Sequence, residues 1–201
     1  MTVTLLLIGI TVGTSLLAWQ QPRLFDALIY WPPAVGRGQW WRLVTHGFIH
    51  GDGTHLLFNM ITLFFFGGVM ERMLVPHVGA VGFALFYLAG IVVAILPSHL
   101  SHRHDQHYRS LGASGAVSAV LFAYILIQPW AMLLVMFLPM PAIAFAAIYV
   151  GYSLWAGRHA RDNINHAAHL WGAAWGVGFM LFLEPRLLPR FFEQLASPPA
   201  F

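Results

Sequence analysis

Long apolar stretches alternate with short polar ones along this chain, a pattern typical of helices that cross a membrane. Such a helix needs roughly 20 mainly apolar residues. Polar or helix-breaking residues close several stretches, as at Glu71-Arg72 and at Pro97. The pattern predicts an all-α membrane protein with six spans, at about residues 2–19, 55–70, 78–96, 112–127, 139–155 and 166–183.

The boundaries of these spans rest on a few local signals. The first apolar stretch has no basic residue before it and no convincing cleavage site of small residues, so we expect a retained span rather than a signal peptide. Pro139 and Pro141 are expected in the first turn of the fifth helix, where a missing N–H is tolerated. Residues 20–54 carry Tyr30, Trp31, Trp40 and Trp41, and such rings favour the headgroup level. This long first loop should therefore lie in the interface. We also expect residues 1–201 to form a single membrane domain, without a separate soluble one.

Composition supports this interpretation and excludes several classes of protein. Hydrophobic residues make up 59% of the chain and charged residues only 8%, whereas a soluble domain carries about 25% charged residues. The ten basic residues are all arginine and are scattered, so no basic patch for nucleic acid is expected. Cysteine is absent, which excludes disulfides, cysteine nucleophiles and thiolate metal sites.

Polar residues inside the predicted spans gather at the starts of three of them. His55 and Asn59 lie in the first turns of the second span, Ser114 begins the fourth, and His166 and His169 lie in the first turn of the sixth. Even-numbered spans all cross in the same direction, so these starts lie on one side of the membrane. Polar groups in hydrocarbon are costly and usually face a cavity or a partner. The sequence therefore places a hydroxyl, two or three imidazoles and a carboxamide at one depth.

The helix starts themselves favour a particular chemistry. Each offers backbone N–H groups without an intrahelical partner and the positive end of its dipole. These groups stabilise negative charge that develops on oxygen during acyl transfer. The fourth span is short and can begin below the surface, which requires a water-filled hollow above Ser114.

Five motifs in this order resemble the rhomboid intramembrane serine proteases. They are Trp41-Arg42 in the first loop, His55-x-x-x-Asn59, Gly67-Gly68-x-x-Glu71-Arg72, Gly112-Ala113-Ser114-Gly115, and Ala168-His169 followed by Gly172 and Gly176. The resemblance runs from about Trp40 to about Glu184. Each motif alone is weak, but five in order are specific. It implies a six-helix rhomboid-like bundle with a long interfacial first loop.

The resemblance also implies roles for individual residues. Ser114 would be the nucleophile and His169 its general base and later acid. His55, Asn59 and Gly112 would form the oxyanion site, together with the Ser114 backbone N–H. Trp41-Arg42 would fix the first loop. No cofactor and no metal are implied.

Simpler interpretations exist for the same residues. The Gly-x-Ser-Gly stretch also suits close helix packing, and Gly115, Gly172 and Gly176 would let two backbones approach. His55 and Asn59 could form a polar clamp between helices. His46 and His50, four residues apart, could suggest a metal pair, but hydrogen bonding within the loop is the better interpretation. His166 could replace His169 as the base. The histidines at 99, 102, 104 and 107 are expected in a solvated loop.

One position, residue 118, departs from the family pattern. The family commonly has an aromatic residue one turn after the serine, packed on the base imidazole, and here that residue is Ser118. Some other group, or Ser118 itself, must therefore hold the His169 ring. No buried aspartate completes a triad. Asp162 lies seven residues before His169, but the family does without such a residue.

The expected function is hydrolysis of peptide bonds in or near transmembrane segments of other membrane proteins. The alternative is a rhomboid-like pseudoprotease that binds membrane clients without cleavage; inactive relatives lose the serine or the histidine, and both are present here. The partners would be transmembrane substrates and the lipid bilayer, and no nucleic acid. The family resemblance places the site on the outer side, in a bacterial inner membrane. Seven arginines would then lie outside and three inside, against the positive-inside tendency.

Overall fold

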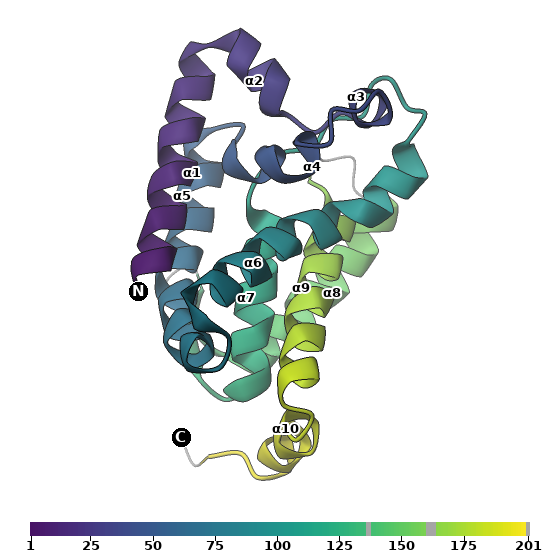
Figure 1. Cartoon of the computed structure of the whole chain (residues 1–201). Helices are drawn as coiled ribbons and strands as arrows, with labels where there is room; N and C mark the ends of the chain where they lie inside the picture. Colours follow the sequence, from purple (N-terminus) through teal and green to yellow (C-terminus); the bar gives the residue numbers. More distant parts are fainter. Residues whose placement is uncertain (136–137, 160–163, 200–201) are drawn as a thin grey trace.

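A computed structural model describes residues 1–135, 138–159 and 164–199 (Figure 1). The chain is mostly helical. Two helical stretches, Thr2–Gln20 and Gly53–His102, are each long and apolar enough to cross a membrane, and Ser114–Ile127 is a shorter apolar helix. The six-span arrangement itself stays a prediction.

The first helix and the long first loop pack on one side of the molecule. Helix α1 (Thr2–Gln20) is followed by the short helices α2 (Pro22–Leu28), α3 (Pro32–Gly36), α4 (Arg42–Thr45) and the 3-10 turn η1 (His46–Phe48). Arg42 holds this loop together, because its guanidinium donates to the carbonyls of Asp26 and Ile29, both at 2.6 Å, and to the Gln39 side chain. Trp41 Nε1 donates to the Ala27 carbonyl at 3.2 Å, so both residues of the Trp41-Arg42 pair hold the loop together, as expected. Tyr30 also pairs with Ser110, which ties the loop to the segment before Ser114.

The second and third predicted spans form one nearly continuous helical path. It comprises α5 (Gly53–Thr62), a π-helical segment η2 (Leu63–Gly67) and α6 (Gly68–His102). The helix does not end at Glu71-Arg72 but continues to Gly79, whose φ of +72° breaks it. Glycine adopts this left-handed conformation without strain. The helix also continues through Pro97, where the sequence predicted a stop; a proline removes one hydrogen bond, which a helix tolerates near its end.

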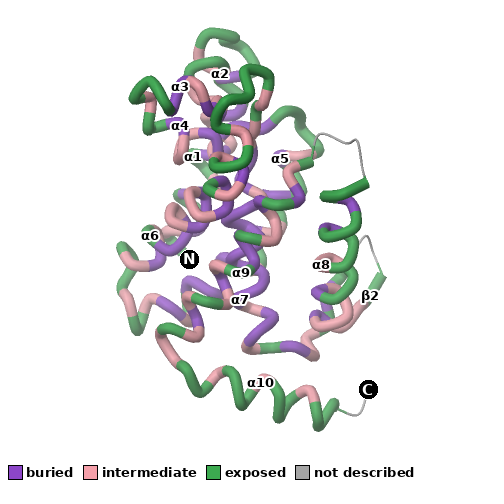
Figure 2. The backbone as a smooth tube through the Cα atoms, turned by 90° about the vertical axis from the view of Figure 1, so that its right-hand side faces the viewer, coloured by how far each residue is buried: buried purple, intermediate pink, exposed green. Residues whose placement is uncertain are grey.

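Helix α7 (Ser114–Ile127) is the centre of the bundle. Eleven of its fourteen residues are buried, so it is covered on all sides. It packs against α6 and against α9 (His166–Leu183), whose bounds agree with the predicted sixth span (Figure 1). Figure 2 shows this buried centre between more exposed outer helices.

The fifth predicted span begins differently from the expectation. Pro139 and Pro141 do not open a helix but lie in β2 (Leu138–Pro141), which pairs antiparallel with β1 (Met132–Val135). A two-stranded hairpin has two free edges, and an edge accommodates residues without an N–H. Helix α8 begins after it and covers Ala142–His159. The final helix, α10 (Leu187–Ala196), lies across the foot of the bundle (Figures 1 and 2).

Candidate active site

Ser114 and His169 are in direct contact. Ser114 is the first residue of α7, and His169 lies in the first turn of α9. Their side chains are joined by a hydrogen bond of 2.8 Å between His169 Nε2 and Ser114 Oγ. Two helix starts therefore bring together a hydroxyl and an imidazole that are 55 residues apart in the sequence.

Glycines make this contact possible. A Cβ added at Gly172 would overlap the Gly115 carbonyl oxygen, and one added at Gly176 would overlap the Ala119 carbonyl oxygen. The backbones of α7 and α9 therefore touch. The predicted close approach through Gly115, Gly172 and Gly176 is confirmed.

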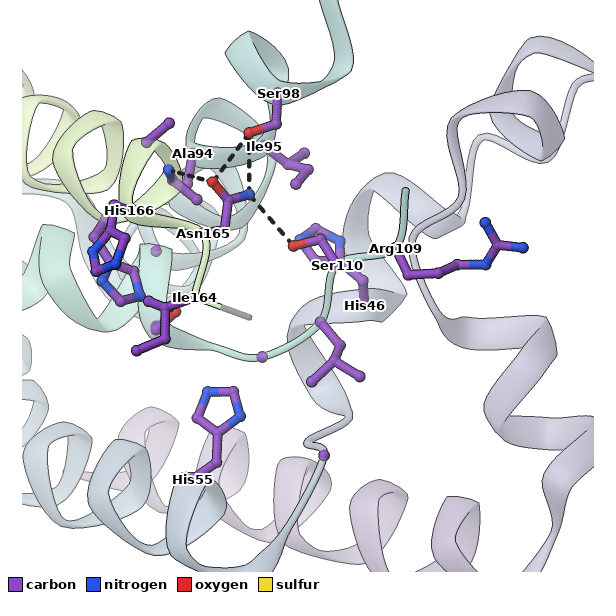
Figure 3. A pocket seen from close by; sticks show the side chains of 18 of the residues that line it. His46, His55, Ala94, Ile95, Ser98, Arg109, Ser110, Ile164, Asn165 and His166 are labelled. Carbon is purple, nitrogen blue, oxygen red and sulfur yellow. Dashed lines mark hydrogen bonds between the residues drawn. The ribbon is translucent and has the colours of Figure 1, made fainter. Parts of the chain in front are cut away.

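A cavity of about 1210 Å³ adjoins the serine and histidine (Figure 3). Its lining includes both of these residues and the three predicted oxyanion residues, His55, Asn59 and Gly112. The starts of α5, α7 and α9 thus meet around a single hollow, as the direction of the even-numbered spans predicted. The hollow gives water a place beside the serine.

The oxyanion candidates differ in how their donors are used. The Asn59 side-chain N–H₂ donates one hydrogen bond to the His55 carbonyl, at 2.9 Å, and retains a second N–H. Gly112 has φ +108°, and an added Cβ would stand 2.6 Å from Cε1 of His55. The Gly112 N–H, however, donates to the His46 carbonyl at 2.9 Å. Gly112 therefore leaves room for the His55 ring through its left-handed conformation and its lack of a side chain, while its N–H is bonded to the first loop.

His50 has a larger part in the site than its sequence position suggested. Only His46 stays within the loop, through a hydrogen bond with the Arg42 carbonyl. His50 instead accepts from the Ala113 N–H at 3.2 Å through Nε2, so Nδ1 carries the proton and donates to Ser15 Oγ. Burial, with a smaller effect of the His55 imidazole, lowers the pKa of His50 to about 3. The neutral ring thus ties the residue before Ser114 to α1.

Asn165 fixes the start of α9. Its Oδ1 caps the helix by accepting from the Ala168 N–H at 3.0 Å, and its side chain also bonds Ser98 and Ser110 (Figure 3). Its Nδ2 donates to the Tyr108 hydroxyl as well. Such a cap stabilises a helix by about 1 kcal/mol. The residue therefore positions the turn that carries His169. An N-cap asparagine before an apolar stretch is a sequence signal that could have identified it.

Comparison with known proteins identifies the fold family. A model of the Rhomboid domain matches residues 37–186, most of the chain. The chain belongs to the rhomboid family. It is 30% identical to the putative rhomboid protease YdcA of Bacillus subtilis, over 71% of this chain and 66% of that protein. It is 27% identical to the rhomboid protease AarA of Providencia stuartii (94% and 74%) and 35% identical to RHOMBOID-like protein 12, mitochondrial, of Arabidopsis thaliana (66% and 43%).

Membership of the rhomboid family indicates a membrane protein related to proteases. Rhomboids are membrane-embedded, and several relatives are named as proteases. The chain spans about two-fifths of the length of RHOMBOID-like protein 12 and about two-thirds of the length of YdcA. Their names include bacterial, mitochondrial and chloroplastic forms, so family membership does not select one membrane.

An aromatic ring lies against the His169 imidazole, and it comes from a helix other than the one that carries Ser114. Tyr149 of α8 stacks on the His169 imidazole, with ring centroids 6.0 Å apart and planes 23° apart. Its hydroxyl and that of Ser118 are hydrogen-bonded at 2.6 Å. An aromatic ring from a residue other than 118 therefore lies against the His169 imidazole, and Ser118 hydrogen-bonds that aromatic residue. Sequence reasoning missed Tyr149 because no motif marks it.

The remaining candidates lie elsewhere or have other partners. The Ser114 hydroxyl bonds His169, while His166 packs edge-on against His169 and Tyr152. Asp162 lies outside the described residues. Within the described part of the chain, no three His, Cys, Asp or Glu side chains gather closely enough to hold a metal ion.

The predicted solvated histidine loop is only partly correct. His99 and His102 belong to the end of α6, where His99 bonds the Tyr30 hydroxyl and His102 stacks on Tyr108. His104 and His107 are exposed, as expected.

Proposed function

We propose that this rhomboid is an active intramembrane serine endopeptidase that uses Ser114 and His169 as a catalytic dyad. The observation that carries the proposal is the 2.8 Å hydrogen bond between Ser114 Oγ and His169 Nε2. A serine hydroxyl is a weak nucleophile until an adjacent base takes its proton, and this distance suits that transfer. The named protease relatives support the same activity at the level of the family.

The chemistry follows from the two side chains. Ser114 Oγ attacks the carbonyl carbon of the scissile peptide bond while its proton passes to His169 Nε2. The imidazolium then gives that proton to the leaving amine, and the peptide is left as an ester on Ser114. Water from the adjoining cavity attacks the ester with His169 again as base, which releases the acid and restores the serine.

The negative charge of each tetrahedral intermediate needs donors. His55 and Asn59 line the same cavity as Ser114, and the Ser114 N–H belongs to the first turn of α7, where amides have no intrahelical partner. We assign the oxyanion role to these three groups. Gly112 supports them by leaving room for the His55 ring.

The substrate would be a membrane protein, cut in or near a transmembrane segment. The proposal includes six crossings, with the starts of α5, α7 and α9 on the outer side. Small residues at the cut and helix-breaking residues nearby would let the substrate unwind and reach Ser114. The host membrane and the identity of the substrate are open to experiment.

The test is cleavage of a transmembrane substrate by purified protein in liposomes, together with labelling by a fluorophosphonate probe. Ser114→Ala and His169→Ala should each lower the cleavage rate by roughly 10³-fold or more. Ser153→Ala on α8 is the matched control, because Ser153 is a buried serine that does not line the cavity, and it should keep the wild-type rate. Cleavage by Ser114→Ala at the wild-type rate would refute the nucleophile, and a folded wild type that neither cleaves nor labels would favour the non-cleaving alternative.

A further inference from the structure

The aromatic neighbour of His169 lies on a helix that takes no other part in the proposed chemistry. Ser114 lies on α7, His169 on α9 and the oxyanion residues on α5 and in the segment before α7. Tyr149 is in the middle of α8 and places its ring against the imidazole at 6.0 Å between centroids. It is also packed by Phe122 at 5.4 Å and by Phe145 at 5.6 Å, so its ring is held on several sides.

Ser118 and Tyr149 are complementary. Ser118 is buried on α7, one turn after Ser114, and its hydroxyl meets the Tyr149 hydroxyl at 2.6 Å. A larger side chain at position 118 would occupy the place of that hydroxyl. The small residue on α7 and the ring on α8 therefore fill one space between them.

We infer that Tyr149 is the positioning residue for His169, and that the base is oriented only while α8 is seated on α7. This rests on the proposed Ser114–His169 dyad. A stacked ring limits rotation of the imidazole about its own bonds and keeps Nε2 directed at Ser114 Oγ. A small misplacement of a catalytic group is enough to lower a rate by about 10²-fold.

The packing of α8 shows how the position of this helix affects the orientation of His169. Its buried residues are small, namely Ala142, Ala146, Ser153 and Ala156, while Ile148, Tyr152, Leu154 and Trp155 are exposed. Figure 2 shows α8 at the edge of the bundle, with much of its surface exposed. Tyr149 is the large side chain that reaches inward to both Ser118 and His169. A displacement of α8 at this level would withdraw the ring from the base.

The inference is tested by separating the reactivity of Ser114 from access of the protein substrate. A small fluorophosphonate reports how well His169 activates the serine, because it needs no unwinding of a helix. Tyr149→Leu should lower both the labelling rate and kcat by about 10- to 100-fold, with KM changed little. Tyr149→Phe keeps the ring and loses the Ser118 bond, so a fall of roughly threefold is expected. Trp155→Leu, on the exposed face of α8, is the control and should match wild type.

A ring transferred to the other helix gives the second line of evidence. Ser118→Tyr combined with Tyr149→Ser returns an aromatic residue to the side of α7 and should recover a substantial part of the activity lost in Tyr149→Leu. Thermal unfolding of each variant distinguishes poor folding from poor orientation. Should Tyr149→Leu not fold, Tyr149→Met decides the matter, because a flexible methionine fills similar space without a ring. It should label about 10-fold more slowly than Tyr149→Phe, and equal labelling rates of the two variants would overturn the positioning role.

Different results overturn the two proposals. A folded Tyr149→Leu protein that labels within twofold of wild type overturns the positioning role while Ser114 stays the nucleophile. A fall in substrate cleavage with unchanged labelling would assign Tyr149 to substrate access instead, and would equally refute the inference. If Ser114→Ala cleaves normally, it is the dyad that fails.

Discussion

The ring of His50 accepts the Ala113 N–H at 3.2 Å, and this contact joins the first loop to the residue before the serine. On its other side the same ring bonds Ser15 of α1. His50 is completely buried, so each ring nitrogen needs its partner. The position of Ser114 consequently depends on a loop histidine more than sixty residues earlier in the chain.

Folding stability should fall in mild acid because of this loop. Burial lowers the pKa of His50 to about 3 and that of His46 to about 4. Below pH 6.5 these two histidines bind protons in the unfolded chain but stay neutral in the folded loop, so the free energy of unfolding decreases with falling pH. Each histidine should lower the free energy of unfolding by roughly 2 kcal/mol between pH 7.5 and pH 5. Thermal unfolding in detergent at the two pH values measures this loss.

A matched variant isolates the share of His50. His50→Gln offers a donor and an acceptor but does not titrate, so its midpoint should be lower than wild type at pH 7.5 and should drop less on going to pH 5. Equal drops in the two proteins would contradict the assignment of the acid sensitivity to this residue.

The contact between α7 and α9 should be intolerant of a single methyl group. Gly172→Ala would place Cβ on the Gly115 carbonyl oxygen and push the helices apart, which separates Ser114 from His169. Overpacking of this kind costs about 1–3 kcal/mol, and cleavage should be lost together with stability. Gly178→Ala, on the same helix, is the control, because a Cβ at Gly178 would meet no atom within 4 Å. Equal stability and activity of the two variants would show that the helices do not meet as described.

Position 112 should accept only glycine. In Gly112→Ala the residue would adopt φ +108° with its Cβ 2.6 Å from the His55 ring, so both the turn and the imidazole must shift. We expect a fall of about 10²-fold in kcat with a smaller effect on the unfolding midpoint. Gly51→Ala lines the same cavity, and its Cβ would lie at an ordinary 3.9 Å from Leu111. It should retain activity; a similar loss in both variants would argue against a specific need at 112.

Features carried by one local signal could be predicted from the sequence. The apolar stretch 166–183 follows a polar loop that ends at Asn165 and is followed by Glu184, so the predicted and observed bounds of α9 agree. The gathering of His55, Ser114 and His169 followed from the direction of alternate spans. The glycine pattern predicted where α7 and α9 touch.

Features that depend on partners distant in sequence could not be predicted. Pro139 and Pro141 suit both a helix start and a hairpin edge, and the pairing with Met132–Val135 decides between them. The sequence predicts the end of a span at Glu71, but this carboxylate accepts from the Thr4 N–H and hydroxyl of α1, and the helix continues through it. Tyr149 lies on a helix whose start carries no functional motif, and only its packing reveals its neighbour.

The replacement of one ring by another has a consequence for how rhomboid sequences are sorted into active and inactive members. A rule that inspects only the residue four places after the nucleophile would find serine at position 118 and conclude that the aromatic ring is missing. In the folded chain an aromatic ring is present, because Tyr149 supplies it from α8. Active and inactive rhomboids should therefore be distinguished by which side chains surround the imidazole in space, whichever alignment position those side chains occupy.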